Sequence, residues 1–362
     1  MKILLVEPNF PIPPKSKNHA HFLPIGLLKI ASYHRSLGDK IELHRGNYPA
    51  QFYPDQIKIT SLFTYWSKYV WESVSYYRKF YPKSWVEIGG IYASLMPEHC
   101  KESGCDKVEK GLYRKGVAEK YEPAYDLVDV DYQIIHASRG CPQRCSFCGT
   151  WKIEPEVTYK KSIKDEIKFN RIIFYDNNLL TNPHIKNILE ELAEMRLNNR
   201  CIQCESQSGF DRKMLTPEIA FLLKRAHFKK PRIAWDEPYS KWSDVKEKIE
   251  VLKEAGFNNK EIFIFMLYNH ELPYEELRRK LDACKHWQVQ VIDCRYRPLN
   301  LPNDRYNPRA KSQRRGEYYI HPNWEDWQVR RFRRSVRRQN ICVRYDIPKW
   351  LPGCEERYIP FE

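Results

Sequence analysis

The chain has 362 residues, of which 42% are hydrophobic and 30% are charged, and its formal net charge at pH 7 is +15. This length is enough for two domains of ordinary size, each with its own core. The chain contains no uninterrupted apolar run of about 18 residues, so we expect no membrane-spanning helix.

Residues 2–7 form a short apolar run that ends at an acidic residue, without a signal-peptide cleavage site. We interpret this run as a first β-strand and expect a cytoplasmic protein. Because the cytosol is reducing, the 11 cysteines of the chain are expected to favour metal binding over disulfide formation.

Residues 1–125 alternate short β-like runs with amphipathic stretches. Such an alternation is typical of a parallel, doubly wound, Rossmann-like sheet. Pro24 begins the first predicted helix and Gly38 closes it. The predicted strands are residues 2–7, 40–45, 56–63 and 85–89, and the predicted helices are residues 24–38 and 67–80.

This order of elements, with Gly89 and Gly90 at the end of a strand, resembles the cobalamin-binding domain that often precedes a radical S-adenosylmethionine (SAM) barrel. That domain family often carries Asp-x-His-x-x-Gly after the first strand, and its histidine ligates cobalt. The corresponding loop here, residues 9–21, lacks the motif, although it contains His19 and His21. We therefore expect a degenerate domain without cobalamin. A domain that binds cobalamin without a histidine ligand is the alternative.

Three cysteines, Cys141, Cys145 and Cys148, follow a predicted strand at residues 133–137 with the spacing Cys-x3-Cys-x2-Cys. Thiolates on such a short loop are typical ligands of an iron–sulfur cluster. Three ligands for a [4Fe-4S] cluster leave one iron open to another molecule. A zinc knuckle is the alternative, but it needs a fourth ligand close by, and the nearest upstream histidine, His136, lies in an apolar strand-like run.

The spacing of these cysteines, with Phe147 directly before the last one, resembles the signature loop of the radical SAM enzymes. The resemblance implies that the amino and carboxylate groups of SAM bind the open iron and that Phe147 packs near the adenine. It further implies that one electron, from a reductant such as flavodoxin or ferredoxin, cleaves SAM to methionine and a 5′-deoxyadenosyl radical. This radical abstracts hydrogen from a substrate.

Residues 126–300 contain six β-like runs whose centres lie roughly 30 residues apart after a longer first interval. Helical patterns fill the gaps, so we predict a partial (β/α)6 barrel of the TIM type with parallel strands. Barrels of this type place their chemistry at the carboxyl ends of strands, which is where the cysteines lie. The predicted strands are residues 133–137, 171–175, 200–204, 232–235, 262–267 and 289–293, and the predicted helices are residues 183–196, 212–226, 241–255 and 274–287.

The other strand ends supply further candidate residues. After the second strand, short polar side chains occupy the turn where the radical SAM family holds the SAM amino group, although the usual Gly-Gly-Glu is absent. A helix cap is the alternative role for Asn178. The resemblance implies cofactor or substrate contacts at Tyr175, Asp176, Asn177 and Asn178 after the second strand, Glu205 and Gln207 after the third, Asp236 (SAM ribose) after the fourth, and Arg295 and Arg297 (SAM or substrate carboxylate) after the sixth.

Cys201 and Cys204 form a Cys-x2-Cys pair that suggests a redox site or a second cluster. Within a strand, however, residues three apart point to opposite faces, so the two thiols are poorly placed to share a ligand. We expect both cysteines to serve only in packing.

The basic character of the chain belongs mainly to the C-terminal extension, residues 301–362, since Lys and Arg outnumber Asp and Glu by 12 to 3 between Arg305 and Arg344. Residues 327–340 are predicted to form a basic amphipathic helix. One interpretation is a nucleic-acid-binding surface with stacking rings. The others are a helix docked on the barrel with its arginines in water, and contact with a membrane surface or an acidic protein. The apolar side carries Val329, Phe332 and Val336, the other sides carry Arg330, Arg333, Arg334, Arg337 and Arg338, and the nearby aromatic residues are Tyr318, Tyr319, Trp324 and Trp327.

These features predict a cytoplasmic radical SAM enzyme that acts on a small-molecule or macromolecular substrate, which no motif identifies. The expected order is a degenerate cobalamin-domain-like α/β unit at residues 1–125, a barrel at residues 126–300, and a basic extension at residues 301–362 that covers the barrel mouth. Two alternatives stay open. One is a cobalamin-dependent radical SAM methyltransferase, and the other is a non-catalytic iron–sulfur protein that binds nucleic acid.

Overall fold

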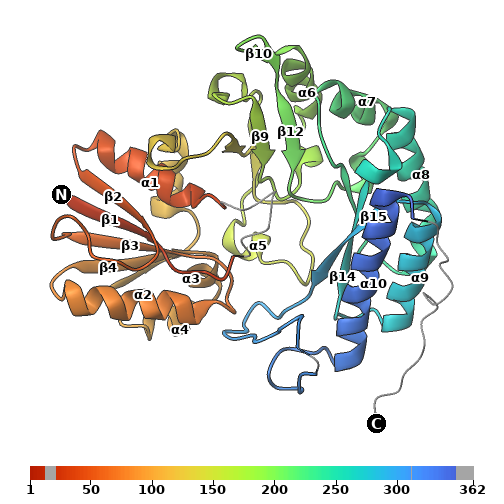
Figure 1. The fold of residues 1–362 in the computed structure, drawn as a ribbon. Helices are drawn as coiled ribbons and strands as arrows, with labels where there is room; N and C mark the ends of the chain where they lie inside the picture. Colours follow the sequence, from red (N-terminus) through yellow and green to blue (C-terminus); the bar gives the residue numbers. More distant parts are fainter. Residues whose placement is uncertain (13–21, 311, 348–362) are drawn as a thin grey trace.

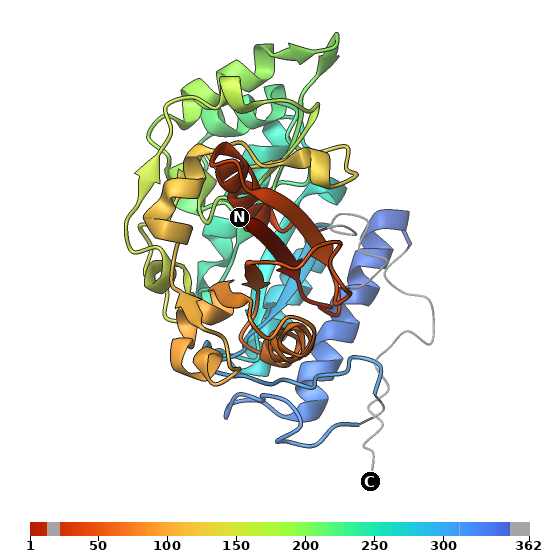
Figure 2. The same cartoon turned by 90° about the vertical axis from the view of Figure 1, so that its left-hand side faces the viewer.

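The computed structural model describes residues 1–12, 22–310 and 312–347. In Figure 1 the N-terminal sheet and its helices lie on the left, and a larger body of strands and helices lies on the right. Figure 2, viewed from the N-terminal side, shows this sheet in front of the larger part. His19 and His21 of the predicted cobalamin loop lie outside the described residues.

The N-terminal part is a parallel sheet with the strand order β2-β1-β3-β4-β5. The strands are β1 (Lys2–Glu7), β2 (Lys40–Arg45), β3 (Gln56–Ser61), β4 (Trp85–Gly90) and β5 (Lys107–Glu109), and the helices are α1 (Ile25–Ser36), α2 (Ser67–Phe80), α3 (Ile91–Leu95) and α4 (Pro97–Lys101). Alternate residues of β1 face opposite sides, so Leu4 packs with α2 whereas Ile3 packs with α1. Both faces are covered, as predicted for a doubly wound sheet. The short β5 was not predicted, because three residues carry little pattern.

Gly90 ends β4 in the left-handed region of backbone conformation, with φ of +107°. A β-carbon on Gly90 would overlap the carbonyl oxygen of Ser61 on the neighbouring strand β3. Gly38 also has a positive φ, +80°, but a β-carbon there would meet no other atom within 4 Å. Replacing Gly38 by alanine therefore tests backbone strain alone, whereas replacing Gly90 by alanine tests backbone strain and steric overlap together.

We expect Gly90→Ala to lower the free energy of unfolding by about 3 kcal/mol and Gly38→Ala to lower it by about 1 kcal/mol. Both changes place an L-residue in the left-handed region, but only the change at Gly90 also forces two strands apart. Chemical denaturation of the two variants measures the difference. Equal losses would mean that backbone strain alone decides the effect.

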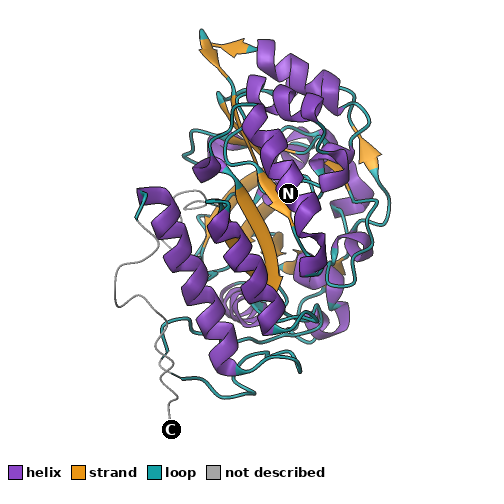
Figure 3. Cartoon of the chain, turned by 90° about the vertical axis from the view of Figure 1, so that its right-hand side faces the viewer, coloured by secondary structure: helices purple, strands orange, loops and turns teal. Residues whose placement is uncertain are grey.

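The larger part contains two three-stranded parallel sheets that follow chain order. The first holds β6 (Gln133–Ile135), β9 (Arg171–Phe174) and β12 (Gln203–Ser206), and the second holds β13 (Arg232–Ala234), β14 (Phe263–Tyr268) and β15 (Gln290–Arg295). The intervening helices are α6 (Ile185–Glu194), α7 (Pro217–Arg225), α8 (Trp242–Glu254) and α9 (Tyr274–His286). Figure 3 shows these helices outside the strands. No helix in the described ranges is long and apolar enough to cross a membrane.

The six predicted strands are present, but the sheet is interrupted between the third and the fourth. Isolated bridges connect the two halves there, such as the one between Phe210 and Ile233. The side chain of Arg232, 5% exposed, donates to the carbonyl oxygen of Ser206 and pairs with Glu205. A buried guanidinium therefore joins β12 to β13 in place of a continuous backbone ladder.

The predicted helix 212–226 is divided in the structure. Residues 212–214 form a 3-10 turn, and α7 begins only at Pro217. Thr216 caps the new helix, because its hydroxyl oxygen accepts a hydrogen bond from the backbone N–H of Ile219 at 3.2 Å. Proline at the first helical position fixes the starting point, since it has no N–H to donate.

The predicted strand 200–204 also divides. Residues 200–201 form β11 (Arg200–Cys201), which pairs antiparallel with β10 (Arg196–Leu197), and β12 begins two residues later. Cys204 is buried in the core of the larger part, whereas Cys201 lies half-buried in the hairpin. The two thiols therefore belong to different strands.

Helix α10 (Asp326–Tyr345) confirms the predicted amphipathic helix and is longer at both ends. Its apolar side, including Val329 and Phe332, joins the core of the larger part. The amide of Asn340 donates to the carbonyl oxygen of Val291 and accepts from its N–H, at 2.7 and 2.8 Å. It thereby covers the edge of β15 as a further strand would. Figure 1 shows α10 lying beside β15 and α9, so the helix docks on the sheet.

The arginines of α10 fall into two groups. Arg330 and Arg333 are half-buried and lie 3.2 and 3.6 Å from the carboxylates of Asp326 and Asp293. The exposed group forms a basic outer face, for which nucleic acid, a membrane surface and an acidic protein stay the predicted partners. The exposed arginines are Arg334, Arg337, Arg338 and Arg344.

The chain between β15 and α10 also contacts the N-terminal part. Asn303 forms a backbone bridge with Trp66, and the hydroxyl of Ser67 donates to the carbonyl oxygen of Pro302 at 2.8 Å. The C-terminal extension therefore connects both parts of the molecule.

Candidate functional site

The cysteine loop, residues 140–149, lies between two short elements, β7 (Ser138–Arg139) and α5 (Thr150–Ile153). β7 pairs antiparallel with β8 (Thr158–Tyr159), which closes the loop at its base. All three cysteines of the loop are half-buried and free of disulfides. They are therefore fixed in place yet accessible to a bound group.

Asp176 holds the start of the cysteine loop. Its carboxylate accepts hydrogen bonds from the backbone N–H groups of Ala137 and Ser138, at 3.0 and 2.6 Å, and from the hydroxyl of Ser138 at 2.5 Å. Burial raises the pKa of this carboxyl, and the three hydrogen bonds act against the rise. A SAM contact was predicted for Asp176, but in the structure both of its oxygens contact the base of the loop.

Asn177 and Asn178 reach the cysteine loop itself. Burial raises the pKa of Cys141, and a hydrogen bond from the side-chain amide of Asn178 acts in the opposite direction. The amide oxygen of Asn177 accepts from the hydroxyl of Thr150 at 3.1 Å, and the backbone N–H of Thr150 donates to the sulfur of Cys148 at 3.5 Å. The end of the second strand is thus connected to two of the three candidate ligands.

Removing the Asn178 amide should lower the reduction potential of a cluster bound at Cys141. A hydrogen bond to a ligating sulfur stabilises the more negative, reduced form of a cluster. A bond worth about 1 kcal/mol more in the reduced form corresponds to about 40 mV. We expect this shift for Asn178→Ala in a redox titration, and none for Asn187→Ala, which lies exposed on α6. An unchanged potential in Asn178→Ala would contradict this role.

Other residues predicted after the second and third strands are engaged with neighbours. Tyr175 packs edge-on against His136, with ring centroids 6.4 Å apart. Glu205 pairs with Arg232 and accepts from the amide of Gln207 at 3.3 Å. The predicted residues Tyr175, Glu205 and Gln207 therefore all contact other side chains of the protein, and Glu205 joins β12 to β13 through Arg232.

Asp236, at the end of the fourth strand, lies near the cysteine loop. Burial is the main cause that raises the pKa of Cys145, and the neighbouring charges of Cys148 and Asp236 add to it. Burial also raises the pKa of Asp236, with Lys280 acting against the rise. Asp236 is thus one of the charged groups that act on Cys145.

Arg295 and Arg297, predicted to hold a carboxylate of SAM or substrate, both contact Asp304 of the C-terminal extension. Arg295 forms an ion pair with Asp304, and the Nε atom of Arg297 lies 3.6 Å from it. The guanidinium of Arg297 also lies over the ring of Tyr65, 4.1 Å from its centroid. The carboxylate that Arg295 and Arg297 contact in this structure is therefore that of Asp304, in the same chain.

His270 was not predicted from the sequence. It lies two residues beyond the end of β14, and its ring contacts that of Phe147 in a T-shaped arrangement with centroids 5.8 Å apart. Since Phe147 lies between Cys145 and Cys148, His270 lies beside the cysteine loop. Asp236 was predicted because barrels of this type place their chemistry at the carboxyl ends of strands. The same reasoning applies to His270, which follows β14.

The donor set fits an iron–sulfur cluster better than a single metal ion. Among the described residues, no three His, Cys, Asp or Glu side chains are arranged to hold one metal ion. Three free thiols on one loop suit a cluster in which each thiolate binds a different iron. The amide oxygen of Asn178 is buried and has no hydrogen-bond partner in the described part of the chain. It is available to a donor on a molecule bound at the open iron.

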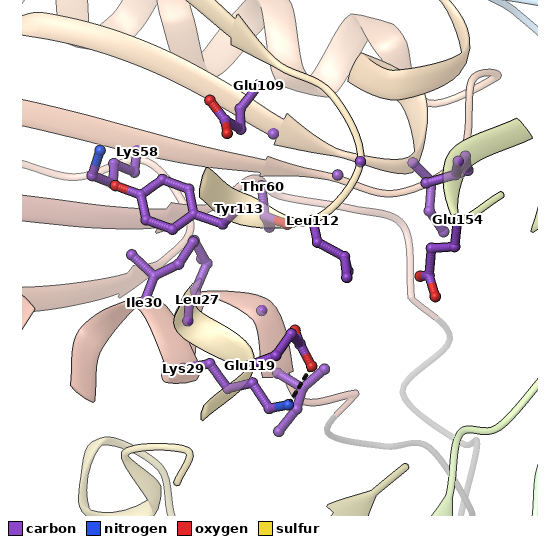
Figure 4. Close-up of a pocket in the computed structure, with 18 of the residues that line it drawn as sticks. Leu27, Lys29, Ile30, Lys58, Thr60, Glu109, Leu112, Tyr113, Glu119 and Glu154 are labelled. Atoms are coloured by element: carbon purple, nitrogen blue, oxygen red, sulfur yellow. Dashed lines mark hydrogen bonds and ion pairs between the residues drawn. The ribbon is translucent and has the colours of Figure 1, made fainter. Parts of the chain in front are cut away.

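A cavity of about 190 Å³ lies between the N-terminal sheet and the segment that follows the cysteine loop (Figure 4). Two ion pairs line it, Lys29 with Glu119 at 2.6 Å and Lys58 with Glu87 at 2.7 Å. Because the charges of both lysines are balanced, the cavity offers mainly apolar surface. Its other lining residues include Leu27, Ile30, Leu112 and Tyr113 from the N-terminal part and His136, Ile153 and Glu154 from the larger part.

No protein-family model and no curated protein sequence matches the chain. Two solved structures of the radical S-adenosylmethionine methyltransferase TsrM from Kitasatospora setae match it, each with a TM-score of 0.64 and 15% sequence identity. The one with cobalamin and a [4Fe-4S] cluster bound covers 83% of this chain and 77% of its own. The one with tryptophan substrate and the SAM analogue aza-SAM covers 83% and 75%. The portion of this chain that the matches leave uncovered is shorter than the N-terminal part and shorter than the larger part. The shared fold therefore extends into both parts.

Proposed function

We propose that the chain, which has the fold of a radical SAM methyltransferase, is a radical SAM enzyme with a [4Fe-4S] cluster at Cys141, Cys145 and Cys148. The observation that carries the proposal is the position of the cysteine loop. It follows the first strand of the larger part, Asp176 at the end of the second strand holds its base, and the neighbouring Asn177 contacts Thr150 directly after it. When bound, the cluster and SAM would together supply a radical by reductive cleavage of SAM.

The chain's own residues would bind and orient these groups. Asp176 holds the base of the loop, and the buried amide oxygen of Asn178 is available to the SAM amino group. Phe147 and His270 offer ring surface beside the loop. An electron would come from an acidic reductant such as flavodoxin or ferredoxin.

Anaerobic reconstitution with iron and sulfide, followed by dithionite and SAM, tests the proposal. We expect the reconstituted chain to form 5′-deoxyadenosine, the product of reductive SAM cleavage. The variant with all three loop cysteines changed to alanine should form none. A cluster that forms but neither binds nor cleaves SAM would overturn the enzyme assignment and favour a non-catalytic iron–sulfur protein.

A cobalamin-dependent radical SAM methyltransferase is the second candidate. The observation that favours it is the fold shared with a cobalamin-bound protein, which extends into the N-terminal part. The residues present fit cobalamin poorly, because the cavity of about 190 Å³ is smaller than the roughly 300–1,000 Å³ of sites for drug-sized ligands. A corrin macrocycle is larger still. We therefore propose an enzyme without cobalamin.

Corrinoid binding separates the two candidates. The purified chain is incubated with hydroxocobalamin, passed through gel filtration, and examined for corrinoid absorbance in the protein peak. We expect no corrinoid absorbance in the protein peak beyond that of hydroxocobalamin free in solution. Retention of one corrinoid per chain would favour the methyltransferase, because it would show that the N-terminal part opens to admit the cofactor.

A further inference from the structure

The basic outer face of α10 carries charge that is not balanced within the described part of the chain. Its members are Arg334, Arg337, Arg338 and Arg344, and none of them forms an ion pair with another described residue. The carboxylates at the two ends of the helix are already engaged. Asp326 pairs with Arg330 at the start, and Asp346 pairs with Lys260 at the end. No ion pair among the described residues therefore neutralises this face.

The neighbouring helix α9 also has exposed arginines, but their charges are balanced. Arg278 lies 3.4 Å from the carboxylate of Glu275. Arg279 lies 3.5 Å from that of Glu276. The two helices lie side by side in Figure 1, so the unbalanced charge belongs to α10. Clustered unpaired arginines repel one another and attract anions, so this face is typical of a surface with an anionic partner.

Two of the four arginines are already oriented for an oxyanion. The Nε atom of Arg334 donates to the carbonyl oxygen of Arg330 at 3.3 Å, and that of Arg344 donates to the side-chain oxygen of Gln290 at 2.8 Å. In both arginines the terminal nitrogens have no hydrogen-bond partner among the described residues. Such a pair of nitrogens can donate to two oxygens of one phosphate. Because these side chains are already held, they lose less entropy on binding.

Two exposed rings lie on the same stripe of α10 as two of the arginines. Trp327 is 39% exposed and Tyr345 is 71% exposed. About five helical turns separate them, so they point in the same direction, roughly 27 Å apart along the axis. Arg334 and Arg338 lie between them on this stripe, within about 20° of the same direction. Cations between exposed rings are typical of proteins that bind phosphates and stack unpaired bases.

The other two predicted partners fit this face less well. A helix that lies on a membrane inserts its apolar side, but Phe332 and Val336 on that side of α10 are each 1% exposed and packed in the core. A protein partner needs a desolvated apolar centre. Between Arg334 and Arg344 the one exposed apolar side chain is Ile341.

We propose that this outer face of α10 binds single-stranded nucleic acid, with its four arginines on phosphates and with Trp327 and Tyr345 stacked on bases. RNA and DNA share this chemistry. A strand of nucleic acid carries one phosphate about every 3.4 Å, so the arginines, which extend over about 15 Å, meet about four phosphates. The proposal does not depend on the proposed function, because no residue of the cysteine loop takes part.

Fluorescence anisotropy of the full reconstituted chain with labelled oligo(U) RNA and oligo(dT) DNA, over a series of salt concentrations, tests the face. One variant combines Arg334→Gln with Arg338→Gln, and a second is Tyr345→Leu. The matched control combines Arg278→Gln with Arg279→Gln, which removes the same charge from α9. Thermal unfolding shows whether each variant is folded.

We expect the α10 double variant to bind oligonucleotides about tenfold more weakly. The slope of log K against log salt concentration should fall in magnitude by about 1.4, because each phosphate contact to a single strand contributes about 0.7. Tyr345→Leu should also bind about tenfold more weakly but keep the wild-type slope, since a stacked ring releases no counterions. The α9 control should bind as the wild type does. The oligonucleotide that binds more tightly identifies RNA or DNA as the source.

Polyglutamate serves as the competitor that has carboxylates but no bases. If it displaces the labelled strand as well as unlabelled oligonucleotide does, the face binds an acidic protein and the proposal is overturned. Equal losses in the α9 control, or no binding by the wild type, would overturn it too. If the α10 double variant does not fold, Arg337→Gln takes the place of Arg334→Gln. Formation of 5′-deoxyadenosine should be the same in all variants, so either result leaves the proposed function intact.

Discussion

Replacing any one of Cys141, Cys145 and Cys148 by alanine is expected to abolish the iron–sulfur cluster and with it all SAM cleavage. A cluster with one open iron has no ligand to spare, since the remaining two thiolates cannot hold three irons. The loop is also closed at its base by the pairing of β7 with β8. Iron and sulfide analysis after anaerobic reconstitution measures the loss, and the visible absorbance of the cluster should disappear in parallel.

Two other cysteines provide the control. Cys201 and Cys342 are half-buried and free, as the loop cysteines are, but lie in β11 and α10. Cys201→Ala and Cys342→Ala should retain the full iron content. Iron that stays at wild-type level in a loop variant would place the cluster elsewhere, and both the loop assignment and the proposed function would fail.

Asp176→Ala is expected to lower the free energy of unfolding by about 4 kcal/mol and to prevent stable cluster assembly. The change removes three hydrogen bonds, and it leaves the backbone N–H groups of Ala137 and Ser138 buried without partners. These residues lead directly into the cysteine loop. The loop therefore loses the contact that fixes its position, although every candidate ligand is still present.

Denaturant unfolding of the cluster-free chain isolates the stability effect, and iron content after reconstitution measures the effect on the loop. Asp131→Ala is the matched control, because the side chain of Asp131 is 82% exposed and lies 3.4 Å from Arg171 at the surface. Its stability should change by less than about 0.5 kcal/mol. A fully stable Asp176→Ala variant would mean that water replaces the carboxylate at the base of the loop.

Most elements of the fold could be predicted from the sequence, because an apolar side chain at every second or every third to fourth position reports directly which face is buried. The continuous apolar run of β1, buried on both faces of its sheet, the amphipathic pattern of α10 and the six strands of the larger part are examples. The predictions of helix and strand boundaries are wrong where a single contact decides the local structure. Thr216 starts α7 late, and Arg232 takes the place of a backbone ladder between two strands.

The candidate ligands could be predicted for a similar reason, since three thiolates for one cluster lie within one short loop. The roles of the other polar residues could not. A carboxylate at a strand end has the same sequence pattern whether it faces a ligand or a neighbouring backbone, as Asp176 does. His270 was missed because nothing in its neighbouring residues marks it.

The sequence by itself determined the order of the strands and helices, the cysteine loop and the docking face of the C-terminal helix. These features depend on residues close together in the chain, and their spacing is visible directly. Only the tertiary structure decided which polar groups are already paired and which remain free. Asp304 pairs with Arg295 and lies 3.6 Å from Arg297, while the buried side chain of Asn269 bonds to backbone atoms of Tyr296, Tyr319 and His321. Such pairings join residues that are far apart in sequence, so no local pattern records them.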